Sequence, residues 1–276
     1  YSVNLNKVQT DDARNYNLND YLNGTAVVSG QPISTFYSYK FLGLNPQNGA
    51  PMFDDWEDRW HLLQGKTLDE VVPMILVNSG TRDPKFSGDL NNTFTYKNWS
   101  LSLNFSYSLG SKVRLFEMYG PIMNGISAAA NVREEFLDRW QVPGDEKYTV
   151  YPSIISPSSP DYEHYRLHYS APQRAVGPNS GVPAFANNVW QMYDDSDLRV
   201  VSGNYLKLQS LSFSYRLNDR LLRKTPFTQL SISFNTHNCF TISAKELRGQ
   251  DPSQAGFADA GLSIRPSYTI GLNVSF

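Results

Sequence analysis

The segment from Trp99 to Leu109 alternates apolar and polar side chains without interruption. Its apolar members are Trp99, Leu101, Leu103, Phe105, Tyr107 and Leu109, and serine or asparagine stands between them. A period of two is that of a β-strand, because successive side chains point to opposite faces. The length matches the roughly 9 to 11 residues with which a tilted strand crosses a membrane, and aromatics lie near both ends. The segment therefore predicts a strand with one face toward lipid and the other toward a polar interior.

The same alternation recurs along the chain. A segment at 89–97 joins the first one through a tight turn at 97–98, which predicts a β-hairpin. The segments 211–215 and 230–234 predict a second hairpin through the basic connection 220–226. Further strands are expected near both ends and as a pair across a turn: 1–6, 268–276, and 33–41 with 50–56 across 45–49. The pattern thus predicts about eight strands.

The connections between these strands differ in length in an ordered way. Short connections are expected at 45–49, 97–98 and 217–226, and long ones at 7–32, 57–87, 111–199 and 242–263. An outer-membrane barrel has short periplasmic turns and long outer loops, whereas a soluble sandwich has no reason to sort its loops. The expected fold class is therefore all-β, a transmembrane antiparallel β-barrel with long extracellular loops. One short loop helix is expected at 128–140, with one face formed by Val132, Phe136, Leu137 and Trp140.

Composition excludes several other classes. Mean hydropathy is −0.43, and no stretch approaches the roughly 18 apolar residues of a membrane helix. A barrel strand remains compatible with low hydropathy because only alternate residues face lipid. The formal charge of −2 without a basic stripe argues against nucleic acid as a partner. The single cysteine, Cys239, cannot form an internal disulfide framework or, alone, a zinc site.

Several short sequence motifs, in a fixed order along the chain, carry a family resemblance. They are Gly30–Ile33 leading to Phe36–Lys40, then Asp83–Gly88, Phe94–Trp99, Arg139–Asp145, Asp197–Ser214, Asn238–Ser243, Gly249–Pro252 and Tyr268–Phe276. Together they cover nearly the whole chain, which resembles the C-terminal part of SusC/RagA-family TonB-dependent transporters. Two departures stand out: Cys239 replaces the usual Leu of an Asn-Leu-Phe phrase, and the Asp-rich segment common before the Asp83 region is absent.

The resemblance implies further parts of a transporter and several partners. Residues 1–276 would be the C-terminal part of a plugged barrel of about 22 strands, with the plug domain, the TonB box and the remaining strands outside this chain. The opening at Tyr1, in mid-pattern and without a signal peptide, also reads as a fragment. The implied partners are TonB, a SusD-like surface lipoprotein, outer-membrane lipid and a glycan or peptide substrate to be imported. Loops 57–87 and 111–199 are expected to form much of the lipoprotein contact.

The residues offer little chemistry of their own. No nucleophile elbow, phosphate loop or His-Glu-x-x-His motif occurs, so we expect no enzyme, no catalytic residue and no cofactor. His164 and His168 have the spacing of two ligands on one helical face, but a third ligand is unspecified. Acidic groups could bind calcium or simply be solvated: Asp54, Asp55, Glu57 and Asp58, and Asp194, Asp195 and Asp197. We expect no metal.

Aromatic residues fall into two groups of candidates. The loop group could contact a sugar or a partner, or could anchor the loops as hydrophobic clusters: Trp56, Trp60, Tyr119, Tyr162, Tyr165, Tyr169, Trp190 and Tyr193. The strand group is expected to form a lipid-facing belt: Trp99, Phe105, Tyr107, Phe213, Tyr215, Phe234, Tyr268 and Phe276.

Two other classes of protein remain open at this point. A soluble secreted carbohydrate-binding β-sandwich would bury its apolar strand faces against each other and would stay in solution without detergent. A β-rich hydrolase would turn over a glycan or a peptide as pure protein.

Overall fold

The computed structural model describes residues 1–10, 16–54, 56–120, 132–156, 158–160, 162–166, 188–253 and 265–276. The chain divides into two compact units. Unit 1 comprises Tyr1–Leu5, Asp83–Val113 and Ser202–Phe276, and unit 2 comprises Asn6–Arg82 and Arg114–Val201. Each unit is described by itself.

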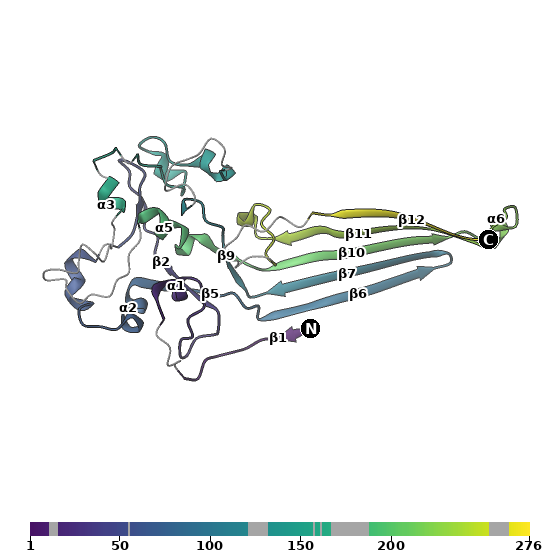
Figure 1. The fold of residues 1–276 in the computed structure, drawn as a ribbon, viewed down its shortest axis with the longest axis horizontal. Coiled ribbons are helices and arrows are strands. Elements are labelled where there is room, and N and C mark those ends of the chain that lie inside the picture. The colour runs from purple at the N-terminus through teal and green to yellow at the C-terminus, as the bar shows by residue number, and fades with distance from the viewer. Residues whose placement is uncertain are drawn as a thin grey trace. The chain divides into compact units, whose positions relative to one another are not determined.

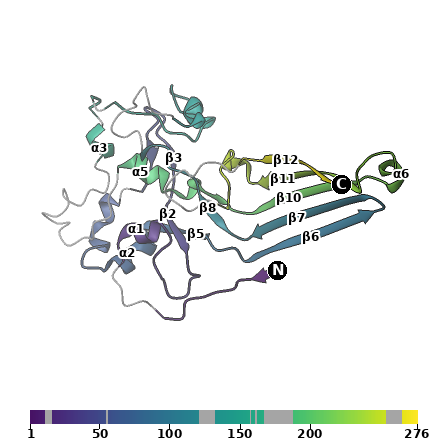
Figure 2. The ribbon, with the colours of Figure 1, turned by 45° about the vertical axis from the view of Figure 1, so that its right-hand side comes forward.

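Unit 1 is built on one antiparallel sheet of six strands (Figures 1 and 2). In spatial order these are β1 (Ser2–Val3), β6 (Phe86–Tyr96), β7 (Trp99–Leu109), β10 (Tyr205–Arg216), β11 (Gln229–Ser243) and β12 (Ser267–Ser275). The two expected hairpins are confirmed as β6–β7 and β10–β11. Their short connections turn at the same end of the sheet. A hydrogen bond from Arg216 N to Asn98 O, at 2.9 Å, joins the two connections there. Short and long connections alternate throughout this sheet, as expected.

The register of the sheet sorts side chains by polarity. Leu101 pairs with Phe94 on one side and Phe213 on the other. Phe213 pairs in turn with Phe234, and Phe234 with Ile270, so one apolar row crosses five strands. The next row is polar: Thr93, Ser102, Ser212, Asn235 and Thr269. Since adjacent rows point to opposite faces, the sheet has one apolar face and one polar face.

A β-bulge keeps this sorting intact within β10. Leu208 and Leu211 are three residues apart, so strict alternation would place them on opposite faces. The register shifts between Leu208 and Ser210 against both neighbouring strands. Leu208 consequently pairs with Phe105 and Phe240, while Leu211 pairs with Leu103. The extra residue therefore restores both leucines to the apolar face.

Unit 2 consists of short elements around an aromatic core. Its helices are α1 (Leu18–Leu22), α2 (Leu68–Ile75), α3 (Tyr162–Arg166) and α5 (Val189–Asp194), with 3-10 turns at Glu57–Leu62, Glu134–Asp138, Asp145–Lys147 and Asp197–Arg199. Its strands pair as β2 (Thr35–Tyr39) with β5 (Leu76–Thr81) and β3 (Gly43–Leu44) with β4 (Pro51–Met52). The ladder of β8 (Lys112–Arg114) and β9 (Val200–Ser202) lies where the chain passes between the units. Unit 1 adds α6 (Asp219–Leu222) and a 3-10 turn at Lys245–Leu247.

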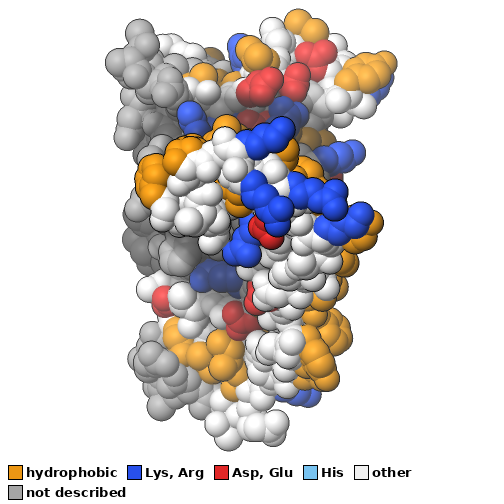
Figure 3. Space-filling model, turned by 90° about the vertical axis from the view of Figure 1, so that its right-hand side faces the viewer, with side chains coloured by type: hydrophobic (Ala, Val, Ile, Leu, Met, Phe, Trp, Pro, Cys, Tyr) orange, Lys and Arg blue, Asp and Glu red, His pale blue; other side chains and the backbone are white. Residues whose placement is uncertain are grey.

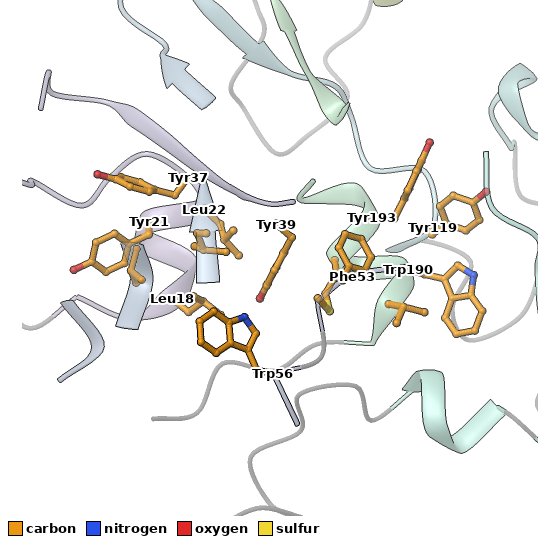
Figure 4. Close-up of a cluster of buried hydrophobic side chains, with 14 of the residues drawn as sticks. Leu18, Tyr21, Leu22, Tyr37, Tyr39, Phe53, Trp56, Tyr119, Trp190 and Tyr193 are labelled. Atoms are coloured by element: carbon orange, nitrogen blue, oxygen red, sulfur yellow. The ribbon is translucent and has the colours of Figure 1, made fainter. Parts of the chain in front are cut away.

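Local capping chemistry starts the two helices that border the core. At α1, Asn17 N donates to Asp20 Oδ2 at 2.8 Å and Asp20 N donates to Asn17 Oδ1 at 3.1 Å, which satisfies two amides that a helix start leaves open. At α2, Thr67 N donates to Glu70 Oε2 at 2.8 Å. Leu18, Tyr21 and Leu22 of α1 and Val71 and Val72 of α2 then enter one buried cluster with β2 and α5 (Figure 4).

One expectation about strands and one about a helix are wrong. The segments 33–41 and 50–56 do not pair with each other, because β2 pairs with β5 instead, and the turn 45–49 joins β3 to β4 within unit 2. All five residues of β2 are buried, so the segment lacks the alternation that would specify a partner. In the part of the chain that the structure describes, the main sheet has six strands, and the expected count of about eight is not confirmed. The expected helix at 128–140 is, in its described part, the 3-10 turn at 134–138: Phe136 and Trp140 are buried but Leu137 is exposed.

Gly49 supports a prediction about the stability of unit 2. Its φ is +70°, and a Cβ there would overlap the Trp140 ring. Gly65 has a similar φ of +73° but nothing within 4 Å of an added Cβ. We expect Gly65→Ala to lower the free energy of unfolding by about 1 kcal/mol and Gly49→Ala by an additional 1 to 3 kcal/mol, roughly, from overpacking. Urea unfolding followed by tryptophan fluorescence measures both, and equal losses would show that the Trp140 contact is unimportant.

Candidate functional site

The eight residues expected to form a belt all belong to the apolar face of unit 1. Trp99, Phe105, Tyr107, Phe213, Tyr215, Phe234 and Tyr268 share this face through the strand register, and Phe276 continues the alternation of β12. Many stay open to the surroundings: Trp99 is 43% exposed and Tyr268 is 65% exposed. Among the described residues of unit 1 no second layer covers these side chains, so the face is available to a partner or to a non-aqueous solvent.

Aromatic rings on this face contact one another between strands. The Trp99 ring centroid lies 4.1 Å from that of Tyr215 and 5.1 Å from that of Phe213. Phe234 and Tyr268 stack at 6.3 Å between β11 and β12. Such cross-strand pairs stabilise an antiparallel sheet and hold the rings in place. The belt is therefore an ordered surface and not a scatter of exposed side chains.

The opposite face of the sheet is a hydrogen-bonded polar wall. Ser212 Oγ donates to Asn235 Oδ1 at 2.6 Å, and the hydroxyls of Thr93 and Ser102 lie 3.0 Å apart. An open hollow of about 560 Å³ lies on this face near the short turns, lined by Ser100, Ser214, Arg216, Ser231 and others. The two faces thus suit two different solvents.

One ion pair secures the segment that follows β11. Lys207 Nζ, on the polar face, lies 3.0 Å from Asp251 Oδ2, and both side chains are largely buried. Burial alone would raise the pKa of Asp251, but hydrogen bonds from Ser253 and Lys207 hold it below the ordinary value. The carboxylate therefore stays ionised and keeps the cation of Lys207 neutralised.

The loop aromatics of unit 2 lie mostly inside its core. Tyr193 is fully buried, Tyr119 is 1% exposed, Trp190 2% and Trp56 8%. Their polar atoms are used internally: Tyr119 Oη donates to Pro152 O at 2.6 Å, and Trp190 Nε1 donates to Ser153 O at 2.9 Å. In this arrangement these four residues anchor loops and present no stacking surface. Figure 4 shows several of them in the cluster.

The remaining loop candidates are placed differently. Tyr162 and Tyr165 are partly buried against the same cluster, next to Trp190. Tyr165 Oη also accepts a hydrogen bond from Asn48 Nδ2 at 3.0 Å. Tyr169 and His168 lie outside the described residues, as does the side chain of Trp60. Ligand or partner contact by this group therefore stays a prediction.

A buried carboxylate of α5 ties this helix to the segment at 118–120. Asp194 accepts hydrogen bonds from the backbone N–H groups of Met118, Tyr119 and Gly120 at 2.8 to 2.9 Å. Burial raises its pKa, while Arg199 and the three donors oppose that shift. Arg199, 2% exposed, donates in turn to Phe116 O at 2.5 Å. Asp194 thus serves as a structural acceptor and not as a calcium ligand candidate.

The neighbouring Asp195 lies near charges of both signs. Burial raises its pKa to about 6, and the charge of Asp194 adds to this, although Arg114 opposes the shift at 3.8 Å. A raised folded-state pKa means that the ionised carboxyl weakens unit 2 above pH 6, and that this penalty is relieved as the pH falls toward the ordinary value of aspartate. Asp197, the third acid of this run, pairs with Lys40 at 2.6 Å.

Sequence reasoning missed one hollow in unit 2. It has a volume of about 300 Å³, and its lining includes Tyr16, Tyr21, Tyr37 and Asp69. The hydroxyl of Tyr21 donates to Asp69, and the rings of Tyr21 and Tyr37 meet edge to face at 5.7 Å. Figure 4 shows both hydroxyls pointing away from the cluster. Rings beside a carboxylate can bind a sugar or a cationic group, but 32 residues separate Tyr37 from Asp69, so no local motif marks the site.

Metal-ligand clusters and membrane-spanning helices are both absent from the described residues. No group of three or more potential metal ligands comes together there. In that same part of the chain, no helix has the length and apolar character needed to cross a membrane.

Comparison with known proteins places this arrangement. No family model matches the chain. It is 23% identical over 269 residues to the TonB-dependent receptor P3 of Formosa agariphila, an alignment that covers 90% of the chain and 22% of the receptor. The chain is thus similar in sequence to part of a TonB-dependent receptor. It spans less than a quarter of that receptor's length.

Solved structures agree with this relationship at the level of the fold. The RagAB peptide transporter matches 91% of the chain with a TM-score of 0.55 and 14% identity, and the chain covers 24% of its length. The RagAB peptide importer in the 'open-open' state gives a TM-score of 0.51 at 14% identity, with 91% of the chain and 23% of the other chain covered. Both units contribute to a match of this coverage. At this identity the likeness concerns the fold alone.

Asp194 supports a prediction about the stability of unit 2. Asp194→Ala leaves three backbone donors without their acceptor and removes the negative charge that faces Arg199, so we expect a loss of about 3 to 5 kcal/mol in the stability of unit 2. Asp54→Ala, which removes an exposed pair with Arg59, is the control and should cost about 1 kcal/mol or less. Thermal unfolding followed by tryptophan fluorescence compares them. A loss at Asp194 no larger than that at Asp54 would contradict the anchoring role.

Proposed function

We propose that the chain is part of an outer-membrane active importer, with the apolar face of unit 1 against lipid and the polar face toward a water-filled, plugged lumen. The observation that carries this proposal is the apolar row from Phe94 to Ile270 beside the polar row from Thr93 to Thr269. A sheet with such faces is stable where one side meets acyl chains and the other meets water.

The edges of the sheet support closure by further strands. Within the described ranges, β12 pairs with β11 alone, and β1 pairs with β6 alone. Unpaired backbone groups are costly in lipid, so a membrane-embedded sheet must close into a barrel. We infer that the missing neighbours are other strands of a barrel of about 22 strands, the class that encloses a plug.

In this proposal the energy for transport comes from the inner membrane. TonB acts on the plug through the TonB box, both outside this chain, and the lumen opens to admit a glycan or a peptide. The hollow that Tyr16, Tyr21, Tyr37 and Asp69 line is a candidate contact site for such a substrate. Both solved structures compared above are of RagAB, which is itself a peptide transporter.

Unit 2 is proposed as the docking region for a SusD-like lipoprotein. The long loop 111–199 presents exposed apolar side chains that its own core does not use: Leu137, Val142 and Tyr148. Exposed apolar residues among polar ones are typical of protein contact surfaces. Removing 145–190 altogether would also remove Trp190 from the core, so point substitutions are the sharper test.

The lipid-facing assignment predicts an asymmetric response to charge. Leu103→Lys places an ammonium group on the apolar face and should cost about 2 to 4 kcal/mol of insertion free energy. Ser100→Lys, on the polar face beside the open hollow, should be tolerated. The folded fraction of the full-length receptor in phosphatidylcholine vesicles, read from heat-modifiable gel mobility, measures both. Equal tolerance at the two sites, or a soluble receptor without detergent, would contradict the proposal.

The docking assignment predicts loss of lipoprotein capture. We expect the triple variant Leu137→Glu, Val142→Glu and Tyr148→Glu to weaken a pull-down at least tenfold, because each change places a charge in an apolar contact of about 1 kcal/mol or more. The control carries Ile33→Glu and Leu42→Glu, which are exposed apolar residues outside the two long loops 57–87 and 111–199. Unchanged capture by the triple variant would remove the idea.

A further inference from the structure

Positive side chains gather at the end of unit 1 where the short connections turn. Lys97 occupies the β6–β7 turn, and Arg220, Arg223 and Lys224 follow one another in the β10–β11 connection. All four are exposed. We name them the turn-end cluster. Figure 3 views this end and shows Lys and Arg side chains beside hydrophobic ones.

Hydrogen bonds hold the two connections next to each other. Arg216 N donates to Asn98 O at 2.9 Å, and Asn98 Nδ2 donates to Arg216 O at 2.8 Å. Within α6, Leu222 is buried, which turns the neighbouring charged residues outward. The cluster is therefore a property of the folded turns and not of one flexible segment.

The cluster keeps a net positive charge in this part of the chain. No ion pair reaches Lys97, Arg220, Arg223 or Lys224 among the described residues. Asp219 is the one acidic residue between 205 and 245. The chain as a whole carries a formal charge of −2, so a concentration of positive charge here is a local feature. Such a surface attracts anions.

Apolar and aromatic groups border the same cluster. Leu221, between the arginines, is 55% exposed. Phe227 and Phe276 meet edge to face at 5.2 Å, and Lys97 Nζ lies 5.1 Å from the Tyr96 ring. Trp99 and Tyr215 pack on the apolar face at this end of the strands. Aromatic rings with adjoining cations are characteristic of the boundary between acyl chains and headgroups.

We propose that the turn-end cluster binds the phosphate groups of anionic phospholipids in the leaflet at the short-turn end. This inference rests on the proposed function, since it requires the apolar face to meet lipid. A phospholipid satisfies both parts of the surface at once: its tails cover the apolar face, and its phosphate lies beside the cations. An acidic protein segment would satisfy the charges alone. Each Lys or Arg near such a surface adds about 1 kcal/mol of attraction, weakened by salt.

A lipid titration tests the proposal on the full-length receptor. Fluorescent short-chain phosphatidylglycerol is titrated into receptor held in uncharged maltoside micelles, with phosphatidylcholine as the zwitterionic comparison. The variant Arg220→Gln, Arg223→Gln and Lys224→Gln should lose at least about tenfold in affinity for phosphatidylglycerol. Arg220→Lys with Arg223→Lys should retain it. The matched control, Lys112→Gln, Lys147→Gln and Lys245→Gln, removes three exposed cations elsewhere and should also retain it.

Several outcomes would overturn the proposal. It fails if the glutamine variant binds as tightly as the parent, if the control loses as much, or if the parent does not prefer phosphatidylglycerol to phosphatidylcholine. It also fails if an octa-glutamate peptide binds the cluster more tightly than the lipid, because the partner would then be a protein. Flotation of the parent receptor with phosphatidylcholine vesicles separates the two claims. A receptor that floats but shows no preference for phosphatidylglycerol contradicts this inference alone. A receptor that does not float contradicts the proposed function.

Discussion

The cross-strand register of the six-stranded sheet is the constraint on which the rest of unit 1 depends. Because side chains alternate with a period of two, a slip of one residue between neighbours would bring Leu101 into a row with serines and mix the faces. The bulge in β10 is the point where this constraint becomes visible. An extra residue disrupts the ladder locally, yet it keeps Leu208 and Leu211 on the apolar side.

Unit 2 solves a different physical problem. Its segments are long connections with few regular elements, so backbone hydrogen bonds of helices and sheets satisfy only part of its polar groups. Buried side chains supply other partners: Asp194 takes three amide donors, and Trp190 and Tyr119 each donate to a carbonyl of the segment at 152–153. The same aromatic rings fill the core. Anchoring therefore accounts for residues that composition alone presents as a binding surface.

The accuracy of prediction from sequence differed between the units for a physical reason. The hairpins β6–β7 and β10–β11 join strands that are neighbours in the chain, and each strand has its own alternation of apolar and polar residues. Both the strand and its partner can therefore be predicted from the local sequence. The segment at 35–39 is buried on all sides and pairs with 76–81, so neither its faces nor its partner leaves a local signal. The strand aromatics share one face because their spacing along each strand defines that face. The hollow at Tyr21, Tyr37 and Asp69 was not found, because its members come from separate elements.

The sequence by itself determined the local geometry of the long strands and, outside the bulge in β10, the side to which their side chains point, since that property follows from the pleat of a single strand. It also carried the family resemblance through the order of its phrases. Only the tertiary structure decided which strands are neighbours, where the bulge corrects the register, and which loop aromatics are buried. Those features depend on contacts between residues far apart in the chain, and the free energy of such contacts is absent from any one segment.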